Sequence, residues 1–313
     1  MNSDTVNPSE RDLSGLLSTE APPSFRGHLG GIRLLKFTSD RRRFLCADLG
    51  MRVKLVADGR TALQFDLGSD SYKARAMDRV RDIAVSEDGG LAFVAAGLHL
   101  RCLDLQQGSE LWRHSPRFMY GFLQTSPRAV GVTKNKNVFV CNDSGTMQLW
   151  RPEGKLVSQW ASNDTPNMVS RLADGTSFVG SDGYGLTVWE PEDGLRTMKL
   201  RSSLRVYALK AFPKSDMVAT RLDGAIGTFD LFAGSLKTAF HIGPGLPYID
   251  VSPLGETLLY GQGRGVALSD LDGKAVAFYE RPGSRVLTAV FDPDGRQIVA
   301  GTDAGDTVRF DVP

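Results

Sequence analysis

Arginine and tyrosine side chains recur at corresponding places along the chain, and their types suit the recognition of anions. Four arginines lie at or near the same point of successive β-like runs: Arg33, Arg81, Arg128 and Arg205. A planar guanidinium forms bidentate, charge-assisted hydrogen bonds with carboxylates and phosphates. Three tyrosines fall in nearby strand starts or turns, where rings can anchor a partner: Tyr184, Tyr207 and Tyr248. The alternative is that the arginines pair internally with aspartates: Asp48, Asp82, Asp143 and Asp182.

Motifs for metal binding and nucleophilic catalysis do not occur in the sequence. The four histidines have no His, Cys or carboxylate at a metal-ligand spacing: His28, His99, His114 and His241. There is no Gly-x-Ser-x-Gly motif. The glycine-rich segment 261–265 precedes no helix, and a phosphate-binding loop needs a helix N-terminus beneath it. We therefore expect a protein that is not an enzyme and holds no metal or cofactor.

Charge, cysteine usage and the N-terminal residues favour a soluble cytoplasmic protein. Three cysteines lie in apolar β-like runs and are expected to be reduced and buried: Cys46, Cys102 and Cys141. Residues 1–20 lack the basic and apolar regions of a secretory signal, and no apolar run reaches the roughly 18 residues of a membrane span. The formal net charge is +1, so no overall field attracts nucleic acid or an anionic membrane.

Short alternating runs repeat along the chain, and they are the elements that must position the arginines. The clearest copies span residues 137–150, 176–189 and 297–310. Each copy combines a β-rich run, a turn with Gly, Asp or Asn, and a second run that ends in an anchor residue. The seven anchors lie 39 to 47 residues apart: Val56, Leu103, Trp150, Trp189, Phe229, Ser269 and Phe310. Alternation with a period of two excludes a solenoid of helices.

Seven such units predict an all-β fold, a seven-bladed β-propeller of four-stranded antiparallel blades over residues 22–313. The last unit supplies only three strands before the sequence ends, and residues 23–28 can supply a fourth. We therefore expect the N-terminal strand to complete the last blade and close the ring. Residues 1–21 are predicted to be a tail, disordered or a short helix. Three leucines of the tail could contact a partner: Leu13, Leu16 and Leu17.

The repeats resemble those of the WD40-like propellers over nearly the whole chain. Gly27-His28 stands before the first inner strand, where that family has Gly-His. Three pairs stand in the place of its Trp-Asp: Trp189-Glu190, Phe229-Asp230 and Phe310-Asp311. No anchor is Trp-Asp itself, so the family's Asp–His–Ser–Trp hydrogen-bond network is not implied for any blade. In such propellers the inner strand begins at the top entrance of the central channel, which would place the four arginines around one mouth.

One segment is similar to a different propeller class. Residues 104–112, from Asp104 to Trp112, match the Asp-x-x-x-Gly-x-x-x-Trp repeat of quinoprotein-type propellers, and Trp160 echoes it. The alternative interpretation is that Trp112 docks between neighbouring blades and needs no cofactor.

Fold alone does not decide function, because propellers host both enzymes and binding modules. We expect a non-enzymatic scaffold or adaptor that binds a protein or peptide partner, with an acidic one favoured, on its top face. The alternatives are a structural subunit of a larger assembly, and an enzyme or small-molecule binder that uses the central channel.

Overall fold

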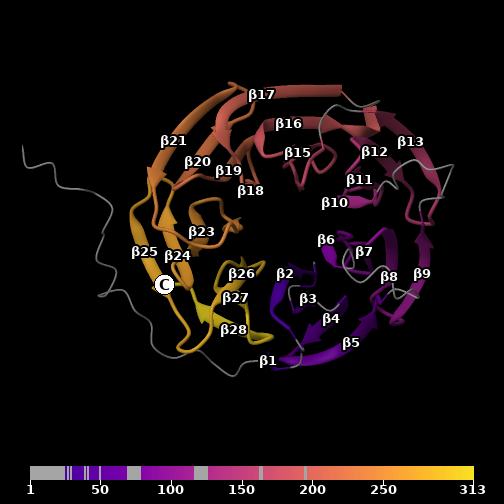
Figure 1. The fold of residues 1–313 in the computed structure, drawn as a ribbon, viewed down its shortest axis with the longest axis horizontal. Coiled ribbons are helices and arrows are strands. Elements are labelled where there is room, and N and C mark those ends of the chain that lie inside the picture. Colours follow the sequence, from indigo (N-terminus) through magenta and orange to yellow (C-terminus); the bar gives the residue numbers. More distant parts are fainter. Residues whose placement is uncertain are drawn as a thin grey trace, which may run out of the picture.

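Seven four-stranded antiparallel sheets surround a central opening in the computed structural model, which confirms the predicted seven-bladed propeller (Figure 1). The structure describes residues 25–26, 28, 30–38, 40, 42–48, 51–68, 79–115, 126–161, 165–193 and 196–313, and the side chains of all of these except 25–26 and 196–204. The predicted tail, with Leu13, Leu16 and Leu17, lies outside the described residues.

The strands follow one another from the inside of each blade to the outside, and blades are numbered here from 1 to 7. Blade 1 contains β2 (Ile32–Phe37), β3 (Arg43–Asp48), β4 (Arg52–Ala57) and β5 (Arg60–Asp66). Blade 2 contains β6 (Val80–Val85), β7 (Leu91–Ala96), β8 (His99–Asp104) and β9 (Ser109–His114). Blade 3 contains β10 (Pro127–Val132), β11 (Val138–Asn142), β12 (Thr146–Trp150) and β13 (Leu156–Ala161). Blade 4 contains β14 (Met168–Arg171), β15 (Phe178–Ser181), β16 (Tyr184–Glu190) and β17 (Arg196–Arg205), with a 3-10 turn at Pro191–Asp193.

The remaining blades keep the same order. Blade 5 contains β18 (Ala208–Ala211), β19 (Met217–Leu222), β20 (Ala225–Asp230) and β21 (Ser235–His241). Blade 6 contains β22 (Ile249–Val251), β23 (Thr257–Gln262), β24 (Gly265–Asp270) and β25 (Ala275–Tyr279). Blade 7 contains β26 (Val286–Phe291), β27 (Gln297–Thr302) and β28 (Asp306–Asp311), and β1 (Phe25–Arg26) pairs with β28 so that Phe25 faces Thr307 and Arg26 faces Asp306.

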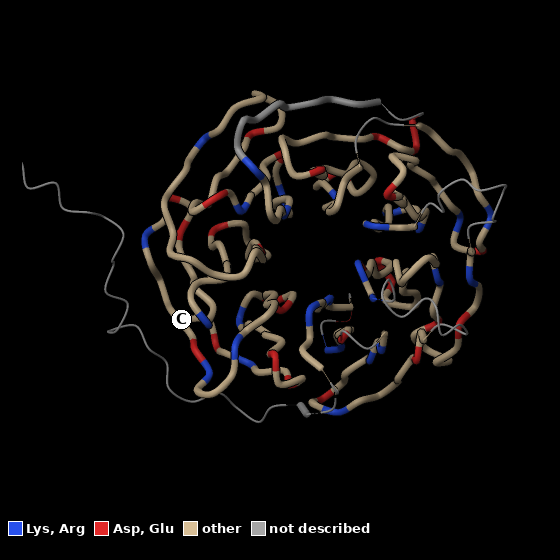
Figure 2. The backbone as a smooth tube through the Cα atoms, viewed as in Figure 1, with Lys and Arg blue, Asp and Glu red and all other residues tan. Residues whose placement is uncertain are grey.

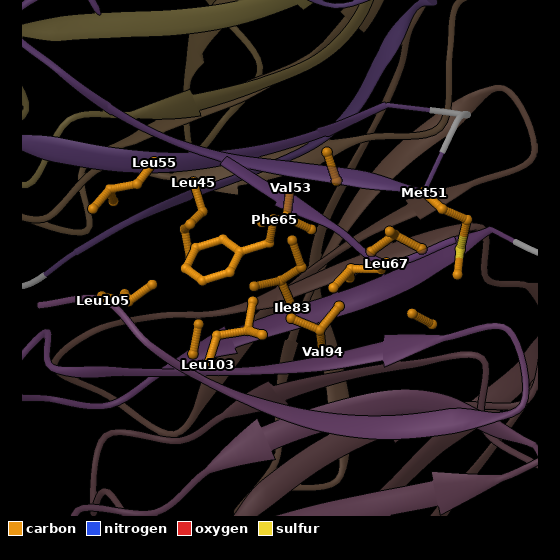
Figure 3. Packing of buried hydrophobic residues seen from close by; sticks show 14 residues of the cluster. Leu45, Met51, Val53, Leu55, Phe65, Leu67, Ile83, Val94, Leu103 and Leu105 are labelled. Carbon is orange, nitrogen blue, oxygen red and sulfur yellow. The ribbon is translucent and has the colours of Figure 1, made fainter. Parts of the chain in front are cut away.

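The core lies between blades, because the middle strands of each sheet are apolar on both faces. In β3 and β7 nearly every residue is buried, whereas the outer strand β9 has no buried residue. Between blades 1 and 2, Leu45 and Phe65 pack with Ile83 and Leu103, side chains that come from two different sheets (Figure 3). Fully burying one such side chain stabilises the fold by about 1.5–3 kcal/mol. A blade therefore gains most of its stability from its neighbours, as expected of a repeat fold.

One contact between blades recurs at the rim. A side chain of the outer strand lies against the glycine in the next blade's turn between its third and fourth strands: Leu63 on Gly108, Trp112 on Gly154, and Phe240 on Gly273. At Gly154 the φ angle is +85°, and an added Cβ would lie 3.1 Å from the indole of Trp112. Trp112 Nε1 also donates a hydrogen bond to the carbonyl of Pro152 at 2.7 Å, and its ring stacks on Trp150. Trp112 thus joins blades 2 and 3, as its structural interpretation requires.

Candidate functional site at the central channel

The seven inner strands line a central channel with a volume of about 880 Å³. Residues of β2, β6, β10, β14, β18, β22 and β26 all contribute to its wall. Small-molecule sites usually occupy roughly 300–1,000 Å³, so the channel has room for a ligand. Basic and acidic segments both occur among the inner strands that surround the opening (Figure 2).

Equivalent positions of the blades can be assigned from one backbone hydrogen bond that closes the inner hairpin of every blade. Its donors are Thr38, Ser86, Thr133, Leu172, Phe212, Ser252 and Asp292. The residues five positions before these donors form what we call the mouth ring, since they begin the inner strands: Arg33, Arg81, Arg128, Asn167, Tyr207, Pro247 and Leu287. One arc of the ring, in blades 1–3, is therefore cationic, and the arc in blades 6 and 7 is apolar.

The three arginines of the mouth ring share an unusual backbone setting. In each case the pairing of the inner strand with its neighbour shifts by one residue, and the arginine is the extra residue of the resulting β-bulge. Leu287 occupies the same kind of bulge in blade 7. A bulge takes its extra residue out of the ladder and re-aims the side chain, and bulges are frequent beside functional sites. The predicted correspondence of Arg33, Arg81 and Arg128 is confirmed at the level of the backbone.

These arginines differ in their surroundings. Arg33 is exposed and contributes to the channel wall. Arg81 is half-buried, with its guanidinium 3.9 Å from Asp143. Burial lowers the pKa of Arg81, Asp143 raises it, and the like charges of Arg79 and Arg128 lower it further. Arg128 donates a hydrogen bond to Asn167, its neighbour in the mouth ring. The positive charges of blades 2 and 3 therefore lie close enough to repel one another.

Arg205 does not occupy the inner-strand position that the sequence predicted, and this is a correction. It ends the outer strand β17, which at ten residues runs further than the turn pattern indicated. There it pairs with Tyr184, which is 67% exposed, and its guanidinium carbon lies 5.1 Å from the centre of the Tyr207 ring. Tyr207 itself fills the mouth-ring position of blade 5 and contributes to the channel wall. The group of Arg205, Tyr207 and Tyr184 therefore adds an aromatic and cationic element beside the arginine arc.

Tyr248 also differs from its prediction as a surface anchor. Its side chain packs in the core between blades 6 and 7 and is only 9% exposed. Its hydroxyl donates a hydrogen bond to the carbonyl of Gly265 at 2.8 Å, and burial raises its pKa. Tyr248 stabilises blade 6 and is not available to a partner.

Along the inner strands, polar side chains fasten alternate blades to the next one. Asp82 accepts a hydrogen bond from the backbone N–H of Val130 at 3.0 Å, which joins blade 2 to blade 3. In the same way Ser170 accepts from Ala211, and Asp250 accepts from Phe291. The charge of Asp82 was foreseen only as a possible partner of arginine, and the structure instead uses it to satisfy a neighbouring backbone donor. No sequence signal identified these three contacts, because each acceptor binds a backbone N–H and Asp82 lies at a different repeat position from Ser170 and Asp250.

A buried Cys–His–Asp set lies at the start of blade 1. His28 Nδ1 is 2.9 Å from an Asp48 carboxylate oxygen, and its Nε2 is 3.0 Å from Cys46 Sγ. The His28 and Asp48 side chains have no exposed surface, and burial raises the pKa of Cys46 to about 12. A reactive cysteine instead needs a lowered pKa and access to substrate. The set therefore fastens the segment at His28 to blade 1, in the place where the Gly-His resemblance pointed.

The structure also shows how the three cysteines and the candidate metal ligands are placed. All three cysteines are free and buried, as predicted. Among the residues that the structure describes, no three His, Cys, Asp or Glu side chains are placed to hold a metal ion. Within the same residues, no helix has the length and apolar character needed to cross a membrane.

Comparisons with known proteins agree with the architecture. No protein-family model matches the sequence, and no curated protein matches it. Among solved structures, the chain is similar to U3-55K with a TM-score of 0.74 and 14% sequence identity, over 92% of this chain and 98% of that chain. The fold is thus a WD40-like β-propeller, in agreement with the resemblance read from the repeats.

Proposed function

We propose that this chain is a non-enzymatic protein-interaction module that binds an acidic peptide segment of a protein partner across the mouth ring. The observation that carries the proposal is the placement of Arg33, Arg81 and Arg128 on matching β-bulges of three consecutive blades. Bulges at equivalent points put three guanidinium groups along one arc, which suits an extended chain of carboxylates or phosphates.

The arc has more positive charge than its own acids engage. Asp143 is the carboxylate nearest to Arg81, and both of its oxygens already accept hydrogen bonds from the backbone N–H and hydroxyl of Ser126. The Nε of Arg81 is buried without a hydrogen-bond partner among the described residues. An unsatisfied buried donor has a cost of about 1–3 kcal/mol, so the nearby acids do not satisfy every donor of Arg81.

The rest of the mouth ring suggests which residues accompany the acidic residue in the partner, because the apolar positions of blades 6 and 7 adjoin the cationic arc at blade 1 (Figure 1). Pro247 and Leu287 in the mouth ring are apolar, and Tyr207 presents an aromatic ring that Arg205 covers. An acidic side chain followed by an apolar or aromatic one would meet both arcs. Aromatic residues and arginines are also the commonest anchors of protein interfaces.

The rim gives less support to the alternative of a permanent structural subunit. Exposed apolar side chains on the described outer strands occur singly or as one pair, on four different blades: Leu111, Leu156 with Val157, Leu236 and Val276. Scattered residues of this kind are normal on a soluble surface, whereas obligate interfaces are large and apolar.

The proposal is tested by selecting random twelve-residue peptides on the full chain and measuring the affinity of the selected peptides by fluorescence anisotropy. We expect enrichment of Asp, Glu or phosphorylated residues, and a Kd that rises with salt. The variant R33Q/R81Q/R128Q should lose at least roughly tenfold in affinity for each contacting arginine, because charge-assisted hydrogen bonds contribute about 1.5–3 kcal/mol.

The matched control is R60Q/R151Q/R296Q, which removes the same charge from exposed positions away from the inner strands. Affinity of this control should stay within about twofold of the wild type. Peptides without acidic enrichment, or equal losses in the two triple variants, would show that the mouth ring does not recognise acids.

A further inference from the structure

A second ring of residues crosses the channel below the mouth ring. These residues lie two positions before the donor of the hairpin hydrogen bond, and we call them the channel ring: Lys36, Ala84, Gly131, Ser170, Lys210, Asp250 and Val290. All seven belong to the channel wall. Four of them have short, uncharged side chains: Ala84, Gly131, Ser170 and Val290. The two lysines and Asp250 carry the charges of the channel ring and therefore determine which ligands it can bind.

The lysines of the channel ring do not each have a carboxylate of their own. Lys210 Nζ lies 2.8 Å from Asp250 Oδ1, and the other oxygen of Asp250 accepts the backbone N–H of Phe291. Asp82 is the second nearby acid, and its two oxygens accept the backbone N–H groups of Ile83 and Val130. Both carboxylates are therefore engaged by other groups.

Lys36 is the charged residue of the channel ring that neither carboxylate engages. No hydrogen-bond or ion-pair partner of its ammonium lies among the described residues, although the charges of Asp82, Lys210 and Asp250 all act on it. Burial is the main cause that lowers the pKa of Lys36. By surface area Lys36 is half-buried and it belongs to the channel wall, so its ammonium is open to an anion in the channel that supplies acceptor oxygens.

The channel offers such an anion a bounded site and an entrance. Its volume of about 880 Å³ exceeds what a phosphate or a small carboxylate needs. Arg33 belongs to the same wall and the same strand as Lys36, and it is exposed at the mouth. A positive side chain at the opening of a low-dielectric channel raises the local concentration of anions.

We propose that the channel binds a small free oxyanion of charge −2 or −3, a phosphate or a compact di- or tricarboxylate, held between the ammonium groups of Lys36 and Lys210. Each lysine donates to a different oxygen of the ligand, and two ammonium groups attract an anion of charge −2 or −3 more strongly than a monovalent carboxylate such as acetate. The site lies below the mouth ring and does not depend on a peptide partner.

The test is calorimetric titration of the full chain with inorganic phosphate, with citrate and with acetate, at equal ionic strength. We expect saturable binding of phosphate or citrate at one site per chain, and at least tenfold weaker binding of acetate. K36M should lose at least tenfold in affinity, and K36R should keep most of it because the charge remains. The matched control K155M, which removes an exposed lysine from a turn of blade 3, should bind like the wild type.

Thermal unfolding without ligand separates a binding site from a structural role of the lysine. K36M is expected to unfold at about the same temperature as the wild type, because Lys36 is half-buried and the substitution removes no hydrogen bond or ion pair among the described residues. Absence of saturable phosphate and citrate binding by the wild type overturns the proposal, and so does unchanged binding by K36M. Binding that is lost in R33Q/R81Q/R128Q and kept in K36M overturns it as well and moves the anion to the mouth ring. Peptide affinity should be unchanged in K36M, so failure here leaves the peptide proposal to its own test.

Discussion

Gly131 on the inner strand β10 has no room for a side chain, and this gives a sharp test of packing between blades 3 and 4. A Cβ added at this glycine would lie 2.1 Å from Cε1 of Phe178. The Phe178 ring is fully buried and stacks on Phe139, with ring centres 5.1 Å apart. Ordinary contact requires more than 3.4 Å, so the ring would have to move by over 1 Å within a closed core. Overpacking of this size costs typically about 1–3 kcal/mol.

We therefore expect Gly131→Ala to lower the free energy of unfolding by about 2–3 kcal/mol, with urea denaturation followed by circular dichroism as the assay. Phe178→Leu replaces the ring by a smaller aliphatic side chain and should relieve part of the clash. In the double variant the loss should be smaller than the sum of the single losses by at least about 1 kcal/mol. Gly90→Ala is the matched control, because its nearest atom, Asp88 Oδ1, would lie at 3.7 Å, an ordinary contact.

A Gly131→Ala protein as stable as the wild type would refute the reasoning, since the ring would then have free space. Strict additivity of the two substitutions would refute it in another way, because the clash between the methyl group and the Phe178 ring could not be the cause of the loss. A change in the slope of the urea transition would point instead to a change in the cooperativity of the blades.

Three further predictions concern the rim and two carboxylates. Trp112→Phe should lower the free energy of unfolding by about 1 kcal/mol in urea, because it removes the indole donor to the Pro152 carbonyl. The side-chain hydrogen bonds from Lys136 and Ser86 are the main causes that lower the pKa of Asp88 to about 2, below its unfolded value of 3.8. Asp88 therefore stabilises the fold above about pH 4 and loses this effect as the pH falls from 4 to 2. Asp88→Asn should show a loss of only a few tenths of a kcal/mol at pH 7, since the pair is half exposed, and none at pH 2 in thermal melts. Burial raises the pKa of Asp82, so the wild type should gain stability relative to Asp82→Asn as the pH falls through that raised value, the opposite trend.

The number and order of blades could be predicted because each blade repeats the same alternation and most blades carry a large apolar anchor on the third strand. Trp150, Trp189 and Phe310 are all buried, as the anchor role requires. The alignment of Arg33, Arg81 and Arg128 followed from the same regularity. The repeat pattern does not predict the length of an irregular strand. Arg205 was assigned to an inner strand, but it is the last residue of the ten-residue outer strand β17.

The hydrogen bonds between blades could not be predicted from the sequence, for a different reason. Asp82 and Asp250 each accept a backbone N–H more than 40 residues further along the chain, and a backbone donor leaves no mark on residue type. The two aspartates also lie at different points of their inner strands, so alignment of the repeats does not reveal a shared role. Tyr248 was misplaced similarly, because its partner is the carbonyl of Gly265.

The separation of mouth ring and inter-blade contacts explains how the proposed binding surface can be charged without weakening the propeller. Arg33, Arg81 and Arg128 stand on bulges, outside the regular ladder, whereas the residues that follow them on each strand make the pairing and the core contacts. Side chains at a bulge can therefore change without removing a ladder hydrogen bond. The hydrogen bond from Val130 to Asp82 fixes the inner strands of blades 2 and 3 to one another, so the spacing of Arg81 and Arg128 along the backbone is set before a partner arrives. A preorganised surface of this kind gains affinity by avoiding the loss of conformational entropy on binding.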